Sequence, residues 1–194
     1  MKKMMILCGS PRENGNTITV VRWVADGARE SGADVEIVIA DKLTYKAYGC
    51  TGCMSCQNSE KYGCVIDDDA SKVTSRIPEQ DVLVFATPVY FMGFSAQLKL
   101  VIDRMFSLFK IHPESIDYAP SLPETSLALI ATGSGTEDQG MQLVVKNMDA
   151  IAGFIGPPAE KFLVPEVSLG PSRLYENEKL KGRAFEFGAS LVSE

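Results

Sequence analysis

Four of the five cysteines in this chain lie close together, in the stretch GCTGCMSCQNSEKYGC at residues 49–64. They are Cys50, Cys53, Cys56 and Cys64. Two residues separate each of the first three, and seven residues separate the third from the fourth. Because a thiolate is both a nucleophile and a metal ligand, this spacing points to metal or redox chemistry.

An iron–sulfur cluster is the first chemistry that this spacing predicts. The ligand run of bacterial ferredoxins also begins with three cysteines at three-residue steps. The present run departs from it in the longer last gap and in Val65, which stands where that run has proline. The remaining cysteine, Cys8, ends an apolar run and is expected in the core. One [4Fe–4S] cluster would therefore need all four cysteines of the stretch.

Two other uses of these cysteines stay open. A zinc site more often pairs two C-x2-C units across a longer gap. Unmetallated thiols, free or redox-active, are the second alternative. A reducing cytoplasm, in which we expect this protein, would keep the thiols available for either use.

Two glycine- and hydroxyl-containing loops lie elsewhere in the chain. GSPRENGNT (9–17) joins an apolar run to a helical pattern, and backbone N–H groups at a helix start attract phosphate. It matches neither the P-loop nor G-x-G-x-x-G, and a turn with an N-cap is the alternative interpretation. TGSGTEDQG (132–140) offers the hydroxyls of three residues, but its GSGTED run lacks the third glycine of a dinucleotide fingerprint.

Aromatic residues dominate a further loop, TPVYFMGFSAQLK (87–99). Tyr90, Phe91 and Phe94 follow a buried apolar run, where they would suit the lining of a site for a flat ring system. The alternative is that they pack a subunit interface or seal the core, and Phe94 fits that role equally well.

Apolar runs alternate with helical patterns along the chain, which is typical of a parallel sheet covered on both faces. Strands are expected at 4–8, 34–40, 81–88, 125–132 and 160–165. Helices are expected at 18–28, 67–77, 95–109, 137–154 and about 174–191, with an irregular loop at 112–123. This α/β pattern predicts a flavodoxin-like sheet of order 2-1-3-4-5, whose ligands sit beyond the carboxyl ends of the strands.

The loops 9–17 and 87–99, in this order, resemble those of the NADPH-dependent FMN reductase family over roughly residues 4–165. The resemblance implies an FMN cofactor, with its phosphate at the first loop and its ring bordered by residues 88–93. The implied cofactor contacts are Ser10, Arg12, Asn16, Thr17, Pro88, Val89, Tyr90, Phe91, Met92, Gly93, Thr132 and Gly133.

The cysteine stretch resembles that of the iron–sulfur flavoproteins, a branch of the same family. This implies a [4Fe–4S] cluster near the FMN of a neighbouring subunit, and hence a homodimer or homotetramer. The resemblance implies an FMN-dependent oxidoreductase that passes electrons from NAD(P)H or ferredoxin to a small acceptor. An NAD(P)H-dependent FMN or quinone reductase with unmetallated cysteines and a flavodoxin-like carrier without enzymatic activity are the alternatives. No side chain stands out as a catalytic acid or base.

Composition limits the remaining classes. A chain of 194 residues is expected to form one domain, 1–194, that carries the cysteine-rich loop at about 45–66. The net charge is −6, with no basic face that would bind nucleic acid. No apolar stretch reaches the roughly 20 residues of a membrane span. His112, the acidic run at 67–69 and Trp23 are expected to have structural or solvated roles.

Overall fold

A parallel sheet of five strands, in the order β2-β1-β3-β6-β7, forms the centre of the structure. A computed structural model describes residues 1–170 and 172–193. The strands of this sheet are β1 (Lys3–Cys8), β2 (Asp34–Ile39), β3 (Val82–Pro88), β6 (Ser126–Thr132) and β7 (Glu160–Val164). The predicted fold and strand order are therefore confirmed, with β6 and β7 as the fourth and fifth strands of the sheet.

The side chains of β1 show why the strands appear in the sequence as unbroken apolar runs. Met5 and Leu7 enter a core on one face of the sheet, and Met4, Ile6 and Cys8 enter a core on the other. Because successive side chains of a strand point to opposite faces, a strand covered on both sides must be apolar throughout.

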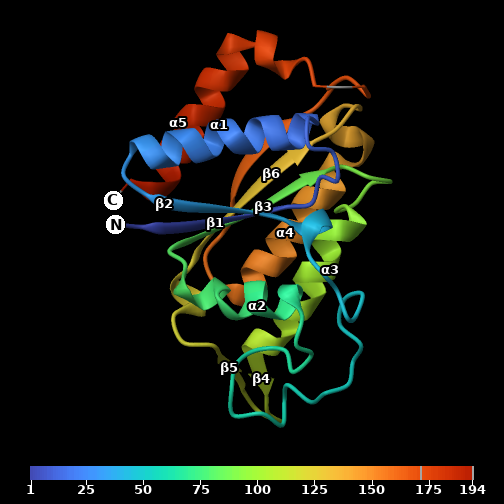
Figure 1. The fold of residues 1–194 in the computed structure, drawn as a ribbon, viewed down its shortest axis with the longest axis vertical. Helices are drawn as coiled ribbons and strands as arrows, with labels where there is room; N and C mark the ends of the chain where they lie inside the picture. The colour runs from blue at the N-terminus through green and yellow to red at the C-terminus, as the bar shows by residue number, and fades with distance from the viewer. Residues whose placement is uncertain (171, 194) are drawn as a thin grey trace.

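The α-helices of the described residues cover the two faces of the sheet (Figure 1). They are α1 (Asn16–Glu30), α2 (Asp69–Ser75), α3 (Ala96–Arg104), α4 (Gln142–Ile155) and α5 (Glu178–Val192). α1 and α5 pack side by side on one face, and α2, α3 and α4 lie on the other. None of the helices described combines the length and the apolar character that a bilayer-spanning segment requires.

The segment 95–123 differs most from the predicted arrangement. The helix expected at 95–109 ends at Arg104, and after a short turn the chain enters β4 (Phe109–Ile111). β4 pairs with β5 (Ile116–Tyr118) in a hairpin, where an irregular loop was expected. Phe109 is buried at the start of a strand. An apolar residue at this position also continues the helical spacing of the preceding residues. Periodicity alone does not distinguish these two cases over so short a segment.

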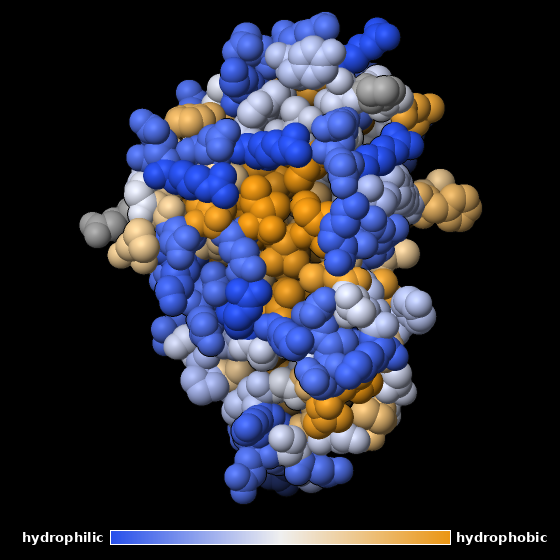
Figure 2. All heavy atoms as spheres, viewed as in Figure 1, coloured by the Kyte–Doolittle hydropathy of each residue, from blue (hydrophilic) through white to orange (hydrophobic). Residues whose placement is uncertain are grey.

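The edge of the sheet at β2 is only partly covered. Val35, Ile37 and Ile39 are half-buried, and they pack against the core beneath α1. Figure 2 shows apolar atoms at the surface between α1 and the layer of α2, over this edge strand. The two helical layers therefore leave an apolar strip along β2.

α1 and α5 cross in close contact at two glycines. A Cβ atom added to Gly27 would lie 1.9 Å from the carbonyl oxygen of Phe185, and one added to Gly188 would lie 1.9 Å from that of Val24. Such distances are impossible for real atoms, so the helix backbones can approach this closely only because both positions lack a side chain.

We expect Gly27→Ala to destabilise the fold strongly, because α1 and α5 must move apart to admit the methyl group. Overpacking of this kind costs about 3 kcal/mol, which lowers Tm by roughly 10 °C in a chain of this size. Thermal unfolding followed by circular dichroism measures it. Gly182→Ala in α5 is the matched control, since a Cβ atom there meets nothing within 4 Å. A Gly27→Ala protein as stable as the control would contradict the close crossing.

Candidate functional site

A cavity of about 120 Å³ lies at the carboxyl ends of the strands, between the loops that follow β1, β3, β6 and β7. Its lining residues are Ser10, Arg12, Gly15, Asn16, Thr17, Pro88, Val89, Tyr90, Thr132, Gly133, Ser134, Val167, Ser168 and Leu169. Nine of the twelve residues that the resemblance implied for FMN are among them. Loops far apart in the sequence thus meet at the edge of the sheet where ligands of such folds bind.

The loop after β1 is fixed to the start of α3 by a close backbone approach. The Ser95 hydroxyl donates to the Gly9 carbonyl at 2.8 Å and accepts from the Leu98 N–H at 3.3 Å, which caps α3. A Cβ atom on Gly9 would lie 2.3 Å from the Ser95 Oγ atom. The glycine that ends the first apolar run is therefore required by packing.

Two buried threonines join the loop after β1 to the end of β6. The Thr17 and Thr132 hydroxyls share a hydrogen bond of 2.8 Å. Thr17 lies in the first turn of α1, and the helix N-terminus with its free N–H groups therefore opens into the cavity. This arrangement can hold an anionic group such as a phosphate.

Asn16 and Arg12 bind the segment that follows β7. The Asn16 Nδ2 atom donates to the Ser168 carbonyl at 2.8 Å, and the Arg12 Nη1 atom donates to the Leu169 carbonyl at 2.8 Å. The Asn16 Oδ1 atom is buried and has no hydrogen-bond partner among the described residues. A buried acceptor without a donor is costly, and a hydroxyl of a bound ligand would satisfy it. The residues present therefore fit a ligand such as FMN, which carries both hydroxyls and a phosphate.

The aromatic loop after β3 projects from the molecule as a tight turn. The Tyr90 and Gly93 backbones bond to each other in both directions, at 3.2 and 3.1 Å. Phe91 and Met92, the two residues at its tip, have φ of 43° and 66°. A positive φ at a residue other than glycine costs free energy, and such residues often cluster at ligand sites. The Phe91 side chain is fully exposed.

The remaining implied FMN contacts divide between two places. Phe91 and Met92 line a second hollow of about 190 Å³, which adjoins the first through Val89, Gly133 and Ser134. Gly93 lines neither hollow. Phe94 is partly buried against the core beneath α3 and α4, so its alternative role as a core seal is confirmed.

Several lining residues have no counterpart in the sequence prediction. Gly15 and Ser134 border the cavity from the loops 9–17 and 132–140, whereas the segment 167–169 lies in no loop that the sequence singled out. The available signal was topological: the strand at 160–165 also ends at the carboxyl edge, so the loop after it must lie near the others.

The four clustered cysteines surround one small cavity. Cys50, Cys53, Cys56 and Cys64 all line it, together with Arg104 from α3. Hydrogen bonds from Ser55 and Thr51 lower the pKa of the exposed Cys53 thiol. The loop turns through Gly49 and Gly52, whose φ of 85° and 66° favour glycine.

The cysteine cavity is closed in this structure. Its volume is about 20 Å³, which suits one water molecule rather than a cluster. Within the described chain, no three His, Cys, Asp or Glu side chains are arranged to hold a metal ion. Residues 50–55 are all exposed, so this half of the loop can move outward without unpacking the core. Four thiols around one cavity fit a tetrathiolate site, provided that the loop opens.

An ion pair with no counterpart in the sequence prediction lies beneath this cavity. The Arg104 side chain is 1% exposed, and its guanidinium pairs with both carboxylate oxygens of Asp68, at 3.1 and 3.0 Å. Burial alone would raise the pKa of Asp68, but hydrogen bonds from Arg104 and from the N–H groups of Ser71 and Lys46 outweigh it and lower the pKa. Asp68 also caps α2, as the acidic helix start predicted.

A second buried cation holds the middle of the cysteine loop. The Lys110 ammonium donates to the carbonyl oxygens of Cys56, Ser59 and Lys61, and it lies over the Tyr62 ring. It fixes the backbone of the loop rather than a sulfur atom.

The remaining cysteine lies apart from this site. Cys8 belongs to the core beneath α1 and α5, on the opposite face of the sheet from α2 and α3, and burial raises its pKa to about 11. Its predicted core role is confirmed. Trp23 is buried in the same core, and His112 is an exposed partner of Asp117.

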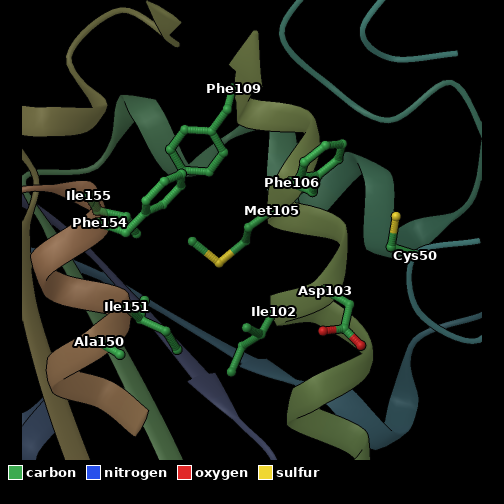
Figure 3. A pocket seen from close by; sticks show the side chains of 10 residues that line it. All are labelled: Cys50, Ile102, Asp103, Met105, Phe106, Phe109, Ala150, Ile151, Phe154 and Ile155. Carbon is green, nitrogen blue, oxygen red and sulfur yellow. The ribbon is translucent and has the colours of Figure 1, made fainter. Parts of the chain in front are cut away.

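An apolar groove of about 520 Å³ runs between α3 and α4 beside the cysteine loop (Figure 3). Ile102, Met105, Ile151 and Phe154 form its walls, and Cys50 lies at its rim. Apart from Asp103, no described lining residue of the groove is charged. This apolar surface lies next to Cys50, one of the four residues of the cysteine cavity.

Comparison with known proteins identifies the family of this chain. A model of the NADPH-dependent FMN reductase family matches residues 2–166. An iron–sulfur flavoprotein of Methanocaldococcus jannaschii is 38% identical over 103 residues, which cover 53% of this chain and 51% of its own. A Bacillus subtilis protein named as an NAD(P)H-dependent FMN-containing oxidoreductase is 24% identical over 165 residues, or 84% of each chain.

A solved structure shows the same fold along nearly the whole chain. The NAD(P)H:quinone oxidoreductase of Methanothermobacter marburgensis has a TM-score of 0.77, with 17% identity over 98% of each chain. The present chain spans about half the length of the iron–sulfur flavoprotein that it matches. Because the family match covers most of the chain, this protein belongs to the NADPH-dependent FMN reductase family.

Proposed function

We propose that this protein is an FMN-dependent oxidoreductase that accepts electrons from NAD(P)H or ferredoxin and passes them to a small acceptor. One observation supports this most directly. Eleven of the twelve residues implied for FMN line two adjoining hollows at the carboxyl ends of the strands. Family membership and the name of the Bacillus relative support the same cofactor and donor.

The proposed FMN contacts divide into two groups. Ser10, Arg12, Asn16 and Thr17 would hold the phosphate and the polar side chain of FMN at the start of α1. The segment 88–93 and residues 132–133 would border the ring. When bound, FMN supplies hydride and single-electron chemistry, which no protein side chain provides.

The residues around the cavity would bind and orient the cofactor, and they offer few groups for acid–base chemistry. Its described lining contains no carboxylate and no imidazole, and Arg12 is its one charged side chain. Val89 and Tyr90, which line the cavity, would help to shield a flat ring from water. The contribution of the protein is thus position and polarity.

We further propose that Cys50, Cys53, Cys56 and Cys64 ligate one [4Fe–4S] cluster, which exchanges single electrons. The common cavity of the four residues and the name of the Methanocaldococcus relative support it. The small volume of that cavity favours the second candidate, an NAD(P)H-dependent FMN or quinone reductase with unmetallated cysteines. A flavodoxin-like carrier remains the third, but it needs only its flavin.

Protein purified and reconstituted without oxygen distinguishes these candidates. We expect about one FMN per chain, and iron and sulfide near four each per chain. FMN without bound iron would favour the unmetallated reductase. If denatured protein releases no FMN and added FMN does not bind, the proposed oxidoreductase is wrong.

We also propose a homodimer or homotetramer, as the resemblance to iron–sulfur flavoproteins implies. The apolar groove beside Cys50 and the exposed Phe91 are surfaces that a second copy would cover. Sedimentation at micromolar concentration is expected to show a species larger than the 21.1 kDa chain. A monomer would contradict a site shared between subunits.

A further inference from the structure

Arg104 is a buried cation that faces the cysteine cavity. It is among the largest fully buried side chains of the described molecule, and it lines the cavity together with the four cysteines. Its Nε atom donates to the Cys64 sulfur at 3.2 Å. Its Nη atoms donate to the Asp68 carboxylate and to the carbonyl oxygens of Ala47 and Ile66. Each nitrogen of the guanidinium is therefore used, and its orientation is fixed.

Asp68 neutralises the charge of Arg104 from outside the cysteine cavity. The carboxylate is buried and paired with Arg104, but it does not line the cysteine cavity. The pair is neutral in sum, while its positive end is nearer to the sulfur atoms than its negative end. Lys110, the other buried cation of the loop, bonds three backbone carbonyls and no sulfur.

A tetrathiolate cluster is anionic, and uptake of one electron adds one further negative charge. The reduction potential of such a cluster depends on its net charge and on hydrogen bonds to its sulfur atoms. A fixed cation that donates to a ligand sulfur stabilises the reduced form more than the oxidised form, because the reduced form is the more negative one. Low polarity around buried groups strengthens this effect.

We propose that Arg104 is a positioning residue that holds Cys64 as a ligand and raises the reduction potential of the cluster, with Asp68 limiting that rise. This inference rests on the proposed cluster. It differs from a purely structural role of the ion pair in one respect. Loss of either partner breaks the same pair, but the two losses change the local charge in opposite directions.

The test compares Arg104→Gln with Asp68→Asn in the full chain after anaerobic reconstitution. The midpoint potential of the cluster is measured by a redox titration that follows the electron paramagnetic resonance signal of the reduced form. We expect a more negative potential for Arg104→Gln, which removes the cation, and a more positive one for Asp68→Asn, which removes the anion. Asparagine still caps α2, so the second change preserves the helix start.

The matched control is Arg76→Gln. Arg76 also pairs with both oxygens of a carboxylate, that of Glu36, at 2.7 and 2.9 Å, and it does not line the cysteine cavity. The midpoint potential of the cluster in Arg76→Gln should equal that of the wild type. Arg104→Lys, which keeps the charge and loses the aimed Nε donor, is expected to lie between the wild type and Arg104→Gln.

Breaking a buried pair is strongly destabilising, so a second variant is needed where the lone buried Asp68 of Arg104→Gln prevents folding. The double variant Arg104→Gln/Asp68→Asn then carries the test, and its potential should lie below that of the wild type. The role of Arg104 would be overturned if the variants had the midpoint potential of the wild type, or if both single variants shifted it in the same direction. Either result would leave the proposed cluster standing. A wild-type protein that takes up no iron would overturn the proposed cluster, and this inference with it.

Discussion

Protein with Cys53→Ala is expected to lose the [4Fe–4S] spectrum completely while it retains about one FMN per chain. Cys53 is one of four cysteines around a single cavity, and the chain has no spare cysteine on that side of the sheet. The residues that line this cavity and those that line the proposed FMN site do not overlap. Absorption spectra and iron analysis after anaerobic reconstitution, with FMN measured on the same sample, check both parts of the result.

Cys8→Ala is the matched control for this prediction. Cys8 is buried on the opposite face of the sheet, so its removal should leave the iron content unchanged. Retention of full iron by Cys53→Ala would remove this residue from the ligand set. Loss of FMN together with iron would show that the two sites are not independent, contrary to their separate linings.

The second large effect is expected from Asn16→Asp, which should weaken FMN binding roughly a hundredfold. The substitution keeps the size of the side chain but puts a negative charge at the start of α1, where the phosphate is proposed. Two like charges about 6 Å apart repel by about 3 kcal/mol at an effective dielectric constant of about 20, and each 1.4 kcal/mol is a factor of about ten in affinity. Titration of FMN fluorescence against apoprotein measures the dissociation constant.

Asn14→Asp makes the same change two residues earlier on the same loop. Asn14 is exposed and does not line the proposed FMN cavity. Its substitution should change the affinity by no more than a few fold, because solvent screens a charge on an exposed side chain. Equal losses for the two variants would mean that the phosphate does not lie at Asn16.

Much of the fold could be predicted from local sequence, because a parallel sheet covered on both faces requires strands that are apolar at every position, and the chain contains such runs. The run MMILC must be apolar at every position to fill two cores at once, and it does so as β1. The same reasoning failed at Phe109. Its burial matched a helical pattern, although the chain had already turned at Arg104 to start a hairpin.

The candidate sites were predictable only where neighbouring residues carried the signal. Spacing alone singled out the four cysteines, and the resemblance of two loops to those of the FMN reductase family implied the proposed FMN contacts. Arg104 could not be found this way, because it lies 40 residues from Cys64 and looks like an ordinary basic residue at a helix end. Only tertiary packing shows that it is buried with Asp68. The segment 167–169 likewise reaches the cavity through hydrogen bonds to Asn16 and Arg12 that span about 150 residues.

The crossing of α1 and α5 at Gly27 and Gly188 also bears on how the chain acquires its structure during synthesis. α1 is translated early, but its apolar side shares a core with Leu180, Ala184 and Val192 of α5. That side therefore stays exposed until more than 150 further residues have left the ribosome. Contacts so distant in sequence slow folding, and exposed apolar surface on a nascent chain favours aggregation. A ribosome-bound chain that stops before α5 should consequently depend on chaperones far more than the finished protein does.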